Sequence, residues 1–256
     1  MRFPILGLAA LAGAAGITPA FAASTTVYYE DFRNVSAFTF NGSAAQRRGT
    51  TGKPVIRLTP SRGGQSGAAY LTTPIVRGPH GEFETQFQFQ IHDGNPTGNW
   101  SDGLTFVITS TPNEIGTETG SGIGYSGDPG SIAVAFDTCA YPNEVGLVQE
   151  GDLSTLNTVS GAWSYAYGQR GSCGVSGAQP SLWLADGDIW TADIKYDGTY
   201  FNVVIQDGSN PVYNAVTNYE TTFPAALRSG PVYVGFTAGT GAGYADYDIL
   251  DWELRY

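Results

Sequence analysis

The stretch that most limits the fold is Phe83–Ile91, FETQFQFQI, in which bulky and polar residues alternate strictly. Successive side chains of a β-strand point to opposite faces, so this period of two predicts an antiparallel strand with one buried and one solvated face. The expected buried set is Phe83, Thr85, Phe87, Phe89 and Ile91, and the expected solvated set is Glu84, Gln86, Gln88 and Gln90. Such a strand needs neighbours to cover its apolar face.

Several other segments also have strand character. The runs GLTFVIT (103–109) and SIAVAF (131–136) are continuously apolar, which predicts central strands covered on both faces. The segment 190–206 predicts a hairpin that turns at Asp197-Gly198. Closing strands are expected at 232–239 and 247–254. With about ten strands and no amphipathic helix of three turns, we expect an all-β fold, a jelly-roll β-sandwich of two antiparallel sheets.

Residues 1–22 have the parts of a secretory signal peptide: Arg2, the apolar run 5–17 and the Ala20-Phe21-Ala22 end. Residues 23–256 are then expected to form a single domain that is secreted or extracellular, in the periplasm, on the cell surface or in the medium. No later run is long and apolar enough to predict membrane insertion. The formal charge of −11 argues against a nucleic acid partner.

The chain has two cysteines, Cys139 and Cys173, in the part predicted to be exported, where disulfides persist, so we expect them to pair. The alternatives are a thiol nucleophile and a pair of metal ligands. Neither has support, because the only histidines, His80 and His92, lack ligand spacing to a cysteine. The glycosylation sequons at Asn34, Asn41 and Asn99 matter only in a host that glycosylates exported proteins.

Residue patterns for catalysis are missing. A glycosidase needs two carboxylates about 5–10 Å apart, which one strand can supply on alternate residues, and no Glu-x-Asp-x-Glu triplet occurs. The acids nearest to this pattern mix both faces of a strand, and we interpret them as turn caps and surface charges: Asp193, Asp197, Asp248, Asp251 and Glu253. The chain also lacks a serine elbow and a phosphate-binding glycine loop that opens a helix. We therefore expect no enzyme activity.

Features for binding are more frequent. Asp102-Gly103 precedes a buried strand, and two glycine-rich loops follow, GSGIGYSG (120–127) and GFTAGTGAGY (235–244). A carboxylate and exposed backbone amides can bind sugar hydroxyls, while a tyrosine offers an apolar platform. Each of these loops alone is more simply interpreted as a turn. The order in which Asp102-Gly103 and the two glycine-rich loops follow one another favours a binding site.

In this order the segments resemble the L-type (legume-type, concanavalin A-like) lectins, including their secreted bacterial relatives. The resemblance covers essentially the whole predicted mature chain. It rests on FTFNGSA (38–44), GQSGAAYLTTPI (64–75), SDGLTFVI, GSGIGY, IAVAFDT, NEVGL, WTADIKYDGTYFNV, VYVGFTAGTG and DILDWEL, which follow the family's motifs in order and spacing.

The resemblance implies a carbohydrate-binding site. Asp102 would accept sugar hydroxyls, often from a cis peptide in this family, with Ser101 here in place of alanine. Ser121 and Gly122 would stand where the glycine loop offers a backbone amide. The remaining expected contacts come from the variable loop 240–244, with Thr240, Gly241 and Tyr244, and from the stacking face of Tyr141.

The family's metal loop is degenerate in this chain. The resembling lectins bind calcium and a transition metal in this loop. This chain has Ala135 in place of their glutamate, Cys139 in place of their aromatic residue, Tyr141 in place of their asparagine and Glu144 in place of their histidine. Only their aspartate is kept, as Asp137. Calcium needs about six oxygen ligands, so a two-metal site is not expected. The alternative is one weakly bound calcium on Asp137 and Glu144. We hypothesise that a Cys139–Cys173 disulfide fixes this loop instead.

The sequence thus predicts a secreted, non-catalytic, lectin-like protein whose partners are glycans or polysaccharide, with no cofactor beyond that single calcium. A homodimer is compatible with the resemblance. Two other functions stay open: a structural or adhesive extracellular sandwich that has lost sugar binding, and an enzyme acting on polysaccharide.

Overall fold

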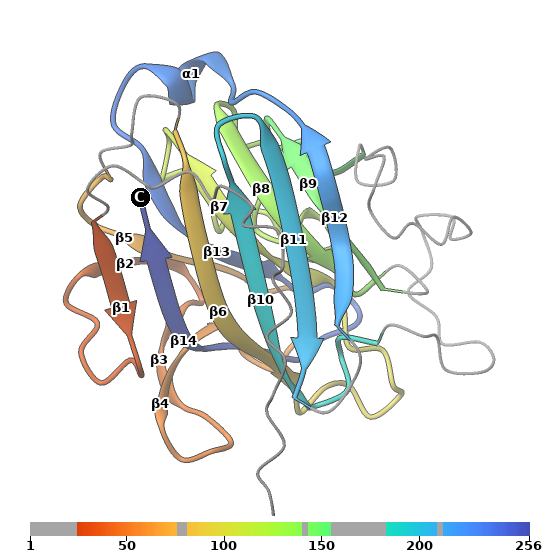
Figure 1. Ribbon diagram of the computed structural model, residues 1–256. Coiled ribbons are helices and arrows are strands. Elements are labelled where there is room, and N and C mark those ends of the chain that lie inside the picture. Colours follow the sequence, from red (N-terminus) through yellow and green to blue (C-terminus); the bar gives the residue numbers. More distant parts are fainter. Residues whose placement is uncertain (1–24, 76–80, 140–142, 155–182, 209–211) are drawn as a thin grey trace, which may run out of the picture.

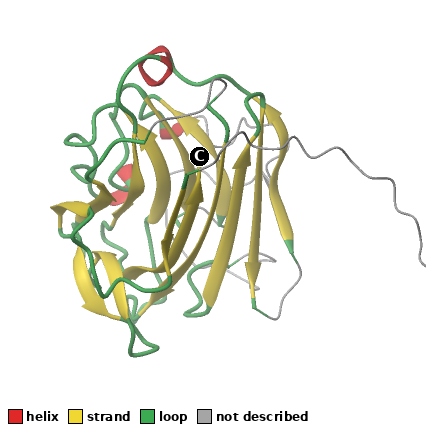
Figure 2. Cartoon of the chain, turned by 60° about the vertical axis from the view of Figure 1, so that its left-hand side comes forward, coloured by secondary structure: helices red, strands yellow, loops and turns green. Residues whose placement is uncertain are grey.

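The computed structural model describes residues 25–75, 81–139, 143–154, 183–208 and 212–256. Within this part the chain folds into two antiparallel β-sheets stacked face to face (Figures 1 and 2). The predicted signal peptide, Tyr141 and Cys173 lie outside the described residues.

The larger sheet has eight strands, in the order β12-β11-β10-β6-β14-β4-β3, with β1 also paired to β14. Their bounds are β1 Thr26–Tyr29, β3 Ala45–Arg48, β4 Pro54–Thr59, β6 Phe83–His92, β10 Ile189–Tyr196, β11 Tyr200–Asp207, β12 Tyr213–Glu220 and β14 Asp246–Arg255. Strands from both halves of the sequence alternate in this sheet, so it forms only when the whole chain is in place.

The smaller sheet has six strands, in the order β2-β5-β13-β7-β8-β9. Their bounds are β2 Phe38–Gly42, β5 Ser66–Leu71, β7 Gly103–Thr109, β8 Ser131–Asp137, β9 Glu144–Gln149 and β13 Tyr233–Gly239. The described part has one short α-helix, α1 Ala225–Arg228, and a 3₁₀ turn at Gly120–Gly122. None of the described helices is long and apolar enough to cross a membrane.

The predicted strands are confirmed. On β6 the five expected inward residues are all buried, from Phe83 to Ile91, but Gln90, expected on the solvated face, is buried as well, because its side chain bonds to Thr50 and to the carbonyl of Gly187. Every residue of β7 is buried, as its continuous apolar run predicts. The predicted hairpin is β10–β11, in which Asp197 Oδ1 accepts hydrogen bonds from the amides of Thr199 and Tyr200 at 2.9 and 2.8 Å. Asp197 is therefore the turn cap that the sequence predicts.

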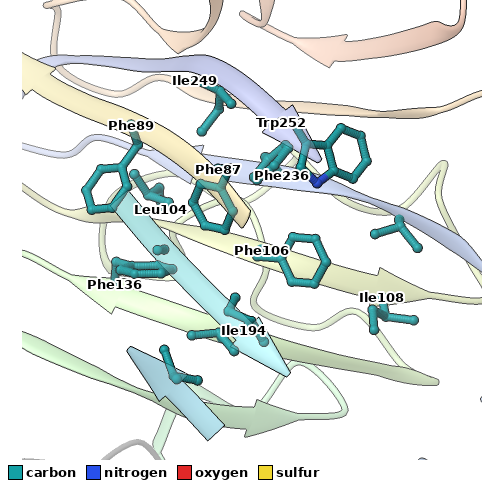
Figure 3. Packing of buried hydrophobic residues seen from close by; sticks show 14 of the residues in the cluster. Phe87, Phe89, Leu104, Phe106, Ile108, Phe136, Ile194, Phe236, Ile249 and Trp252 are labelled. Carbon is teal, nitrogen blue, oxygen red and sulfur yellow. The ribbon is translucent and has the colours of Figure 1, made fainter. Parts of the chain in front are cut away.

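Aromatic side chains fill the space between the sheets (Figure 3). Phe87 of β6 lies edge-on to Phe236 of β13 with ring centroids 4.9 Å apart, and Phe236 meets Trp252 of β14 at 5.1 Å. Offset and edge-to-face contacts of this kind stabilise a core beyond the area that they bury. They also join both sheets into one rigid body.

A second, smaller core covers the outer face of the six-stranded sheet. Val107 of β7 and Ala133 and Ala135 of β8 pack there against Ile123 and Tyr125 of the segment between β7 and β8. Residues 110–130 therefore lie over the sheet as a third layer. This packing explains why β7 and β8 are apolar on both faces.

Candidate functional site

The described residues of the predicted sugar-binding site gather at one end of strands β13, β7 and β8 of the six-stranded sheet. β7 begins at Gly103, while β8 ends at Asp137 and β13 at Gly239. Because β7 runs antiparallel to both neighbours, Gly103 pairs with Asp137 on one side and with Gly239 on the other. Asp102, one residue before β7, therefore lies between the loops that follow β8 and β13.

Asp102 is held through its backbone. Its N–H donates to the carbonyl of Gly239 at 3.1 Å, and its own carbonyl accepts from the amides of Thr138 and Cys139 at 2.9 and 3.2 Å. The Ser101–Asp102 peptide bond is cis, as the resemblance implies. Asp102 is only 5% exposed, so the loops around it almost cover its carboxylate, and we call this enclosed position the recess.

Two glycines form the walls of this recess. A Cβ atom on Gly241 would lie 3.0 Å from Asp102 Oδ2, and one on Gly120 would lie 4.0 Å from the same atom. The amide of Gly120 donates to the carbonyl of Thr240 at 3.0 Å, which joins the two glycine loops beside the carboxylate. Gly241 is needed for this close approach, whereas Gly120 is favoured by its positive φ of 60°.

The structure separates the two predicted amide donors. The N–H of Gly122 donates to the carbonyl of Thr119 at 3.2 Å and is used inside the turn. Ser121 is exposed, and its amide makes no hydrogen bond to another described residue. Ser121 is therefore the amide of this turn that can donate to a ligand, whereas Gly122 shapes the turn.

The loop 240–244 is fixed by residues 60–65, for which the sequence predicted no role in the site. The hydroxyl of Thr240 donates to the carbonyl of Arg62 at 2.7 Å and accepts from the amide of Gln65 at 3.0 Å. Thr240 is fully buried, so it positions the loop rather than facing a ligand. Tyr244 is partly exposed, and its amide donates to Asn99 O at 3.1 Å.

Burial and, to a smaller extent, the neighbouring carboxylate of Asp137 together raise the pKa of Asp102 to about 6, against a backbone hydrogen bond from Gly241 that lowers it. Loss of hydration penalises the charged form of an acid, and a second negative charge adds to that penalty. Asp102 is thus mostly ionised at neutral pH, but its pKa lies only about one unit below that pH.

The comparison with known families agrees with this geometry. A family described as "Legume lectin domain" matches residues 24–256. The chain belongs to the legume lectin family. Its relatives include a probable L-type lectin-domain containing receptor kinase I.2 of Arabidopsis thaliana, 27% identical over 223 residues. They also include a lectin of Lens culinaris subsp. orientalis, 25% identical over 231 residues.

The two alignments cover 78% and 82% of this legume lectin chain. The chain spans 31% of the length of the Arabidopsis protein and 76% of the lentil lectin.

Solved structures show the same fold. Peanut lectin has a TM-score of 0.66 at 17% identity, covering 91% of this chain and 97% of its own. A Bauhinia forficata lectin in complex with GalNAc has a TM-score of 0.64 at 20% identity, covering 91% and 98%. Arcelin-5, a lectin-like defence protein of Phaseolus vulgaris, has a TM-score of 0.63 at 16% identity, covering 91% and 98%. The predicted concanavalin A-like jelly-roll sandwich is thereby confirmed.

The described residues of the predicted metal loop make hydrogen bonds within the protein. Asp137 Oδ1 accepts a hydrogen bond from the amide of Cys139 at 2.8 Å, and Glu144 lies opposite Asp137 in the β8–β9 register. The side chain of Asn143 donates to Thr138 O at 3.3 Å and accepts from the amide of Leu184 at 2.7 Å. Among the described residues, Asp137 and Glu144 belong to no group of three ligands.

Two predicted elements of this loop cannot be placed. Tyr141 and Cys173 both lie outside the described residues, so the stacking role of Tyr141 and the Cys139–Cys173 pairing stay predictions. No described cysteine is a free thiol.

One sequence interpretation is wrong. Asp248 is not a surface charge but is fully buried, and it accepts hydrogen bonds from both Nε and Nη2 of Arg57, at 2.7 and 2.8 Å. His92 Nε2 lies 2.9 Å from Asp248 Oδ2, and Arg57 also pairs with Asp246. Burial lowers the pKa of His92, but hydrogen bonds to Asp248 and Asp93 outweigh burial and raise it. A buried aspartate needs such partners.

Proposed function

We propose that this legume lectin chain is a secreted carbohydrate-binding protein that recognises glycan without catalysis. The observation that carries the proposal is the recess at Asp102, in which a carboxylate lies between Gly120 and Gly241, next to the exposed Ser121. A carboxylate accepts hydrogen bonds from sugar hydroxyls, and an exposed amide donates to a sugar oxygen.

Each residue has a distinct role in the proposed site. Asp102 accepts from a hydroxyl of the sugar ring, and the Ser121 amide donates to a hydroxyl of the same ring. Tyr244 flanks the ring on the loop 240–244, with Tyr141 proposed as a further stacking face. Thr240 and Gly241 hold and shape the recess, because Thr240 is buried and Gly241 lies against the carboxylate.

We further propose that the site works with a reduced metal centre or none. The changed ligand positions support this, since Ala135 and Cys139 offer no side-chain oxygen, whereas calcium needs about six oxygen ligands. A Cys139–Cys173 disulfide would fix the loop covalently. One weakly bound calcium on Asp137 and Glu144 is the alternative that the experiment below tests.

The decisive experiment is a glycan array, probed with the oxidised protein in calcium and manganese and again in EDTA. We expect binding in both conditions and its loss in Asp102→Asn. The matched control is Asp193→Asn, which removes one exposed carboxylate from β10 of the other sheet and keeps an acceptor for its partner Gln86.

Binding only with metal would mean that Asp137 and Glu144 still hold an ion. No binding in either condition would refute the lectin proposal and favour a structural or adhesive protein. Sugars to include are N-acetylgalactosamine and methyl α-D-galactose, because solved relatives from Bauhinia forficata and winged bean are complexes with these sugars.

A further inference from the structure

We infer that the buried hydroxyl of Tyr247 is a positioning group of the carbohydrate site, and this inference rests on the proposed function. Tyr247 is the second residue of β14 and is fully buried. Its strand belongs to the eight-stranded sheet, whereas Asp102 directly precedes β7 of the six-stranded sheet. The side chain therefore reaches across the sandwich from one sheet to the other.

The hydroxyl meets two groups at the base of the site. It lies 3.3 Å from the carbonyl of Trp100 and 2.9 Å from Oγ1 of Thr138. A carbonyl can only accept, so the single hydrogen of the tyrosine goes to Trp100. The hydroxyl of Thr138 must then donate to the tyrosine oxygen. The direction of the whole chain of hydrogen bonds is thus fixed: Thr138 to Tyr247 to Trp100.

Both contacts act on the segment that carries the carboxylate. Trp100 is two residues before Asp102, and the amide of Thr138 donates to the carbonyl of Asp102 at 2.9 Å. Tyr247 therefore touches the polypeptide on both sides of Asp102, once directly and once through Thr138. Removal of its oxygen would leave the carbonyl of Trp100 and the hydroxyl of Thr138 without these partners in a buried place.

The base of Tyr247 is itself firmly anchored. Its neighbours in sequence, Asp246 and Asp248, pair with Arg57 on β4, and Asp248 also contacts His92 on β6. Three adjacent strands are thereby joined beside the tyrosine. The backbone of Tyr247 is therefore firmly held, so its hydroxyl can fix the segment 100–102 relative to the larger sheet.

Tyr247→Phe tests this role because it removes one oxygen and keeps the ring. We expect glycan binding to weaken by about tenfold, comparable to the loss of one or two well-placed hydrogen bonds. The matched control is Tyr196→Phe. Tyr196 is also buried and its hydroxyl donates to a backbone carbonyl, that of Gly198 at 2.8 Å. Tyr196 pairs with Phe83 at the start of β6, whereas Tyr247 pairs with Ile91 near its end, so the control lies away from the proposed site.

Affinity is measured by titrating immobilised wild-type and variant proteins with the sugar that gives the strongest array signal, and unfolding in urea is measured in parallel. We expect both variants to lose stability but only Tyr247→Phe to lose affinity. Equal affinity losses in both variants, or none in Tyr247→Phe, would overturn the inference.

A second variant, Thr138→Val, removes the donor to the tyrosine while keeping side-chain shape. If the two residues act as one unit, the affinity loss of the double variant is less than the sum of the single losses. Additive losses would refute the coupling, and Thr138→Val also tests the inference if Tyr247→Phe fails to fold. A wild-type protein that binds no glycan would instead refute the proposed function, so the two failures are distinguishable.

Discussion

Lowering the pH should weaken glycan binding through Asp102. Its pKa is about 6, and the ionised carboxylate is a much stronger acceptor for a sugar hydroxyl than the protonated acid. With that pKa, about 97% of the protein carries the ionised group at pH 7.5 and about 9% at pH 5. The association constant for sugar should therefore fall about tenfold between these two pH values.

Lowering the pH should have the opposite effect on stability: through Asp102 it should raise the free energy of unfolding. The pKa of Asp102 is raised from 3.8 to about 6 in the folded state, so the folded protein holds this proton more tightly than the unfolded chain. The stabilisation is complete below pH 3.8 and is lost as the pH rises through 6. The shift corresponds to at most about 3 kcal/mol, since one pKa unit is about 1.4 kcal/mol. Asp102→Asn should therefore raise the free energy of unfolding at pH 7.5.

The assay compares wild type with Asp102→Asn in sugar titrations and urea unfolding at pH 5, 6 and 7.5. Asp128, whose pKa is also about 6, is common to both proteins, so its contribution cancels in the comparison. The reasoning is refuted if wild-type affinity is flat from pH 7.5 to 5. It is equally refuted if Asp102→Asn is less stable than wild type at pH 7.5.

Three further predictions concern the recess, a buried acid and the core. Gly241→Ala places a methyl group 3.0 Å from Asp102 Oδ2 and should reduce array binding by about tenfold, whereas Gly208→Ala, with open space around its Cβ, should not. Asp128→Asn should raise the urea midpoint at pH 7.5 but not at pH 4.5, because burial raises the pKa of Asp128 and its Oδ2 makes no hydrogen bond within the described structure. Phe87→Ala should lower the free energy of unfolding by about 3–5 kcal/mol, measured by urea unfolding; a loss under about 1 kcal/mol would contradict its place in the core.

The fold could be read from the sequence because its strongest signals are local. The alternation in 83–91 and the apolar runs at 103–109 and 131–136 each report the environment of one strand, and all three appear as β6, β7 and β8. Antiparallel sheets with one covered face produce such patterns directly. The predicted place of Asp102 followed from the same runs, since it directly precedes one of them.

The supporting contacts could not be read in this way, because they join distant segments. Asp248 looked like a surface charge until β14 paired with β4 and placed it beside Arg57, 191 positions earlier. Thr240 looked like a ligand contact, but the segment 60–65 covers it. Which polar residue is buried depends on tertiary neighbours rather than on local sequence.

The buried Thr240 has a consequence for changing the sugar preference of this protein by directed evolution. A library that randomises the whole loop 240–244 would mostly yield misfolded clones, since Thr240 joins two loops and Gly241 has no room for a side chain. Diversity placed at the exposed Ala242 and the partly exposed Tyr244 alters what a bound sugar meets while the support below stays intact. The loop thus has two positions that can be varied, Ala242 and Tyr244, and two that must be kept for it to fold, Thr240 and Gly241.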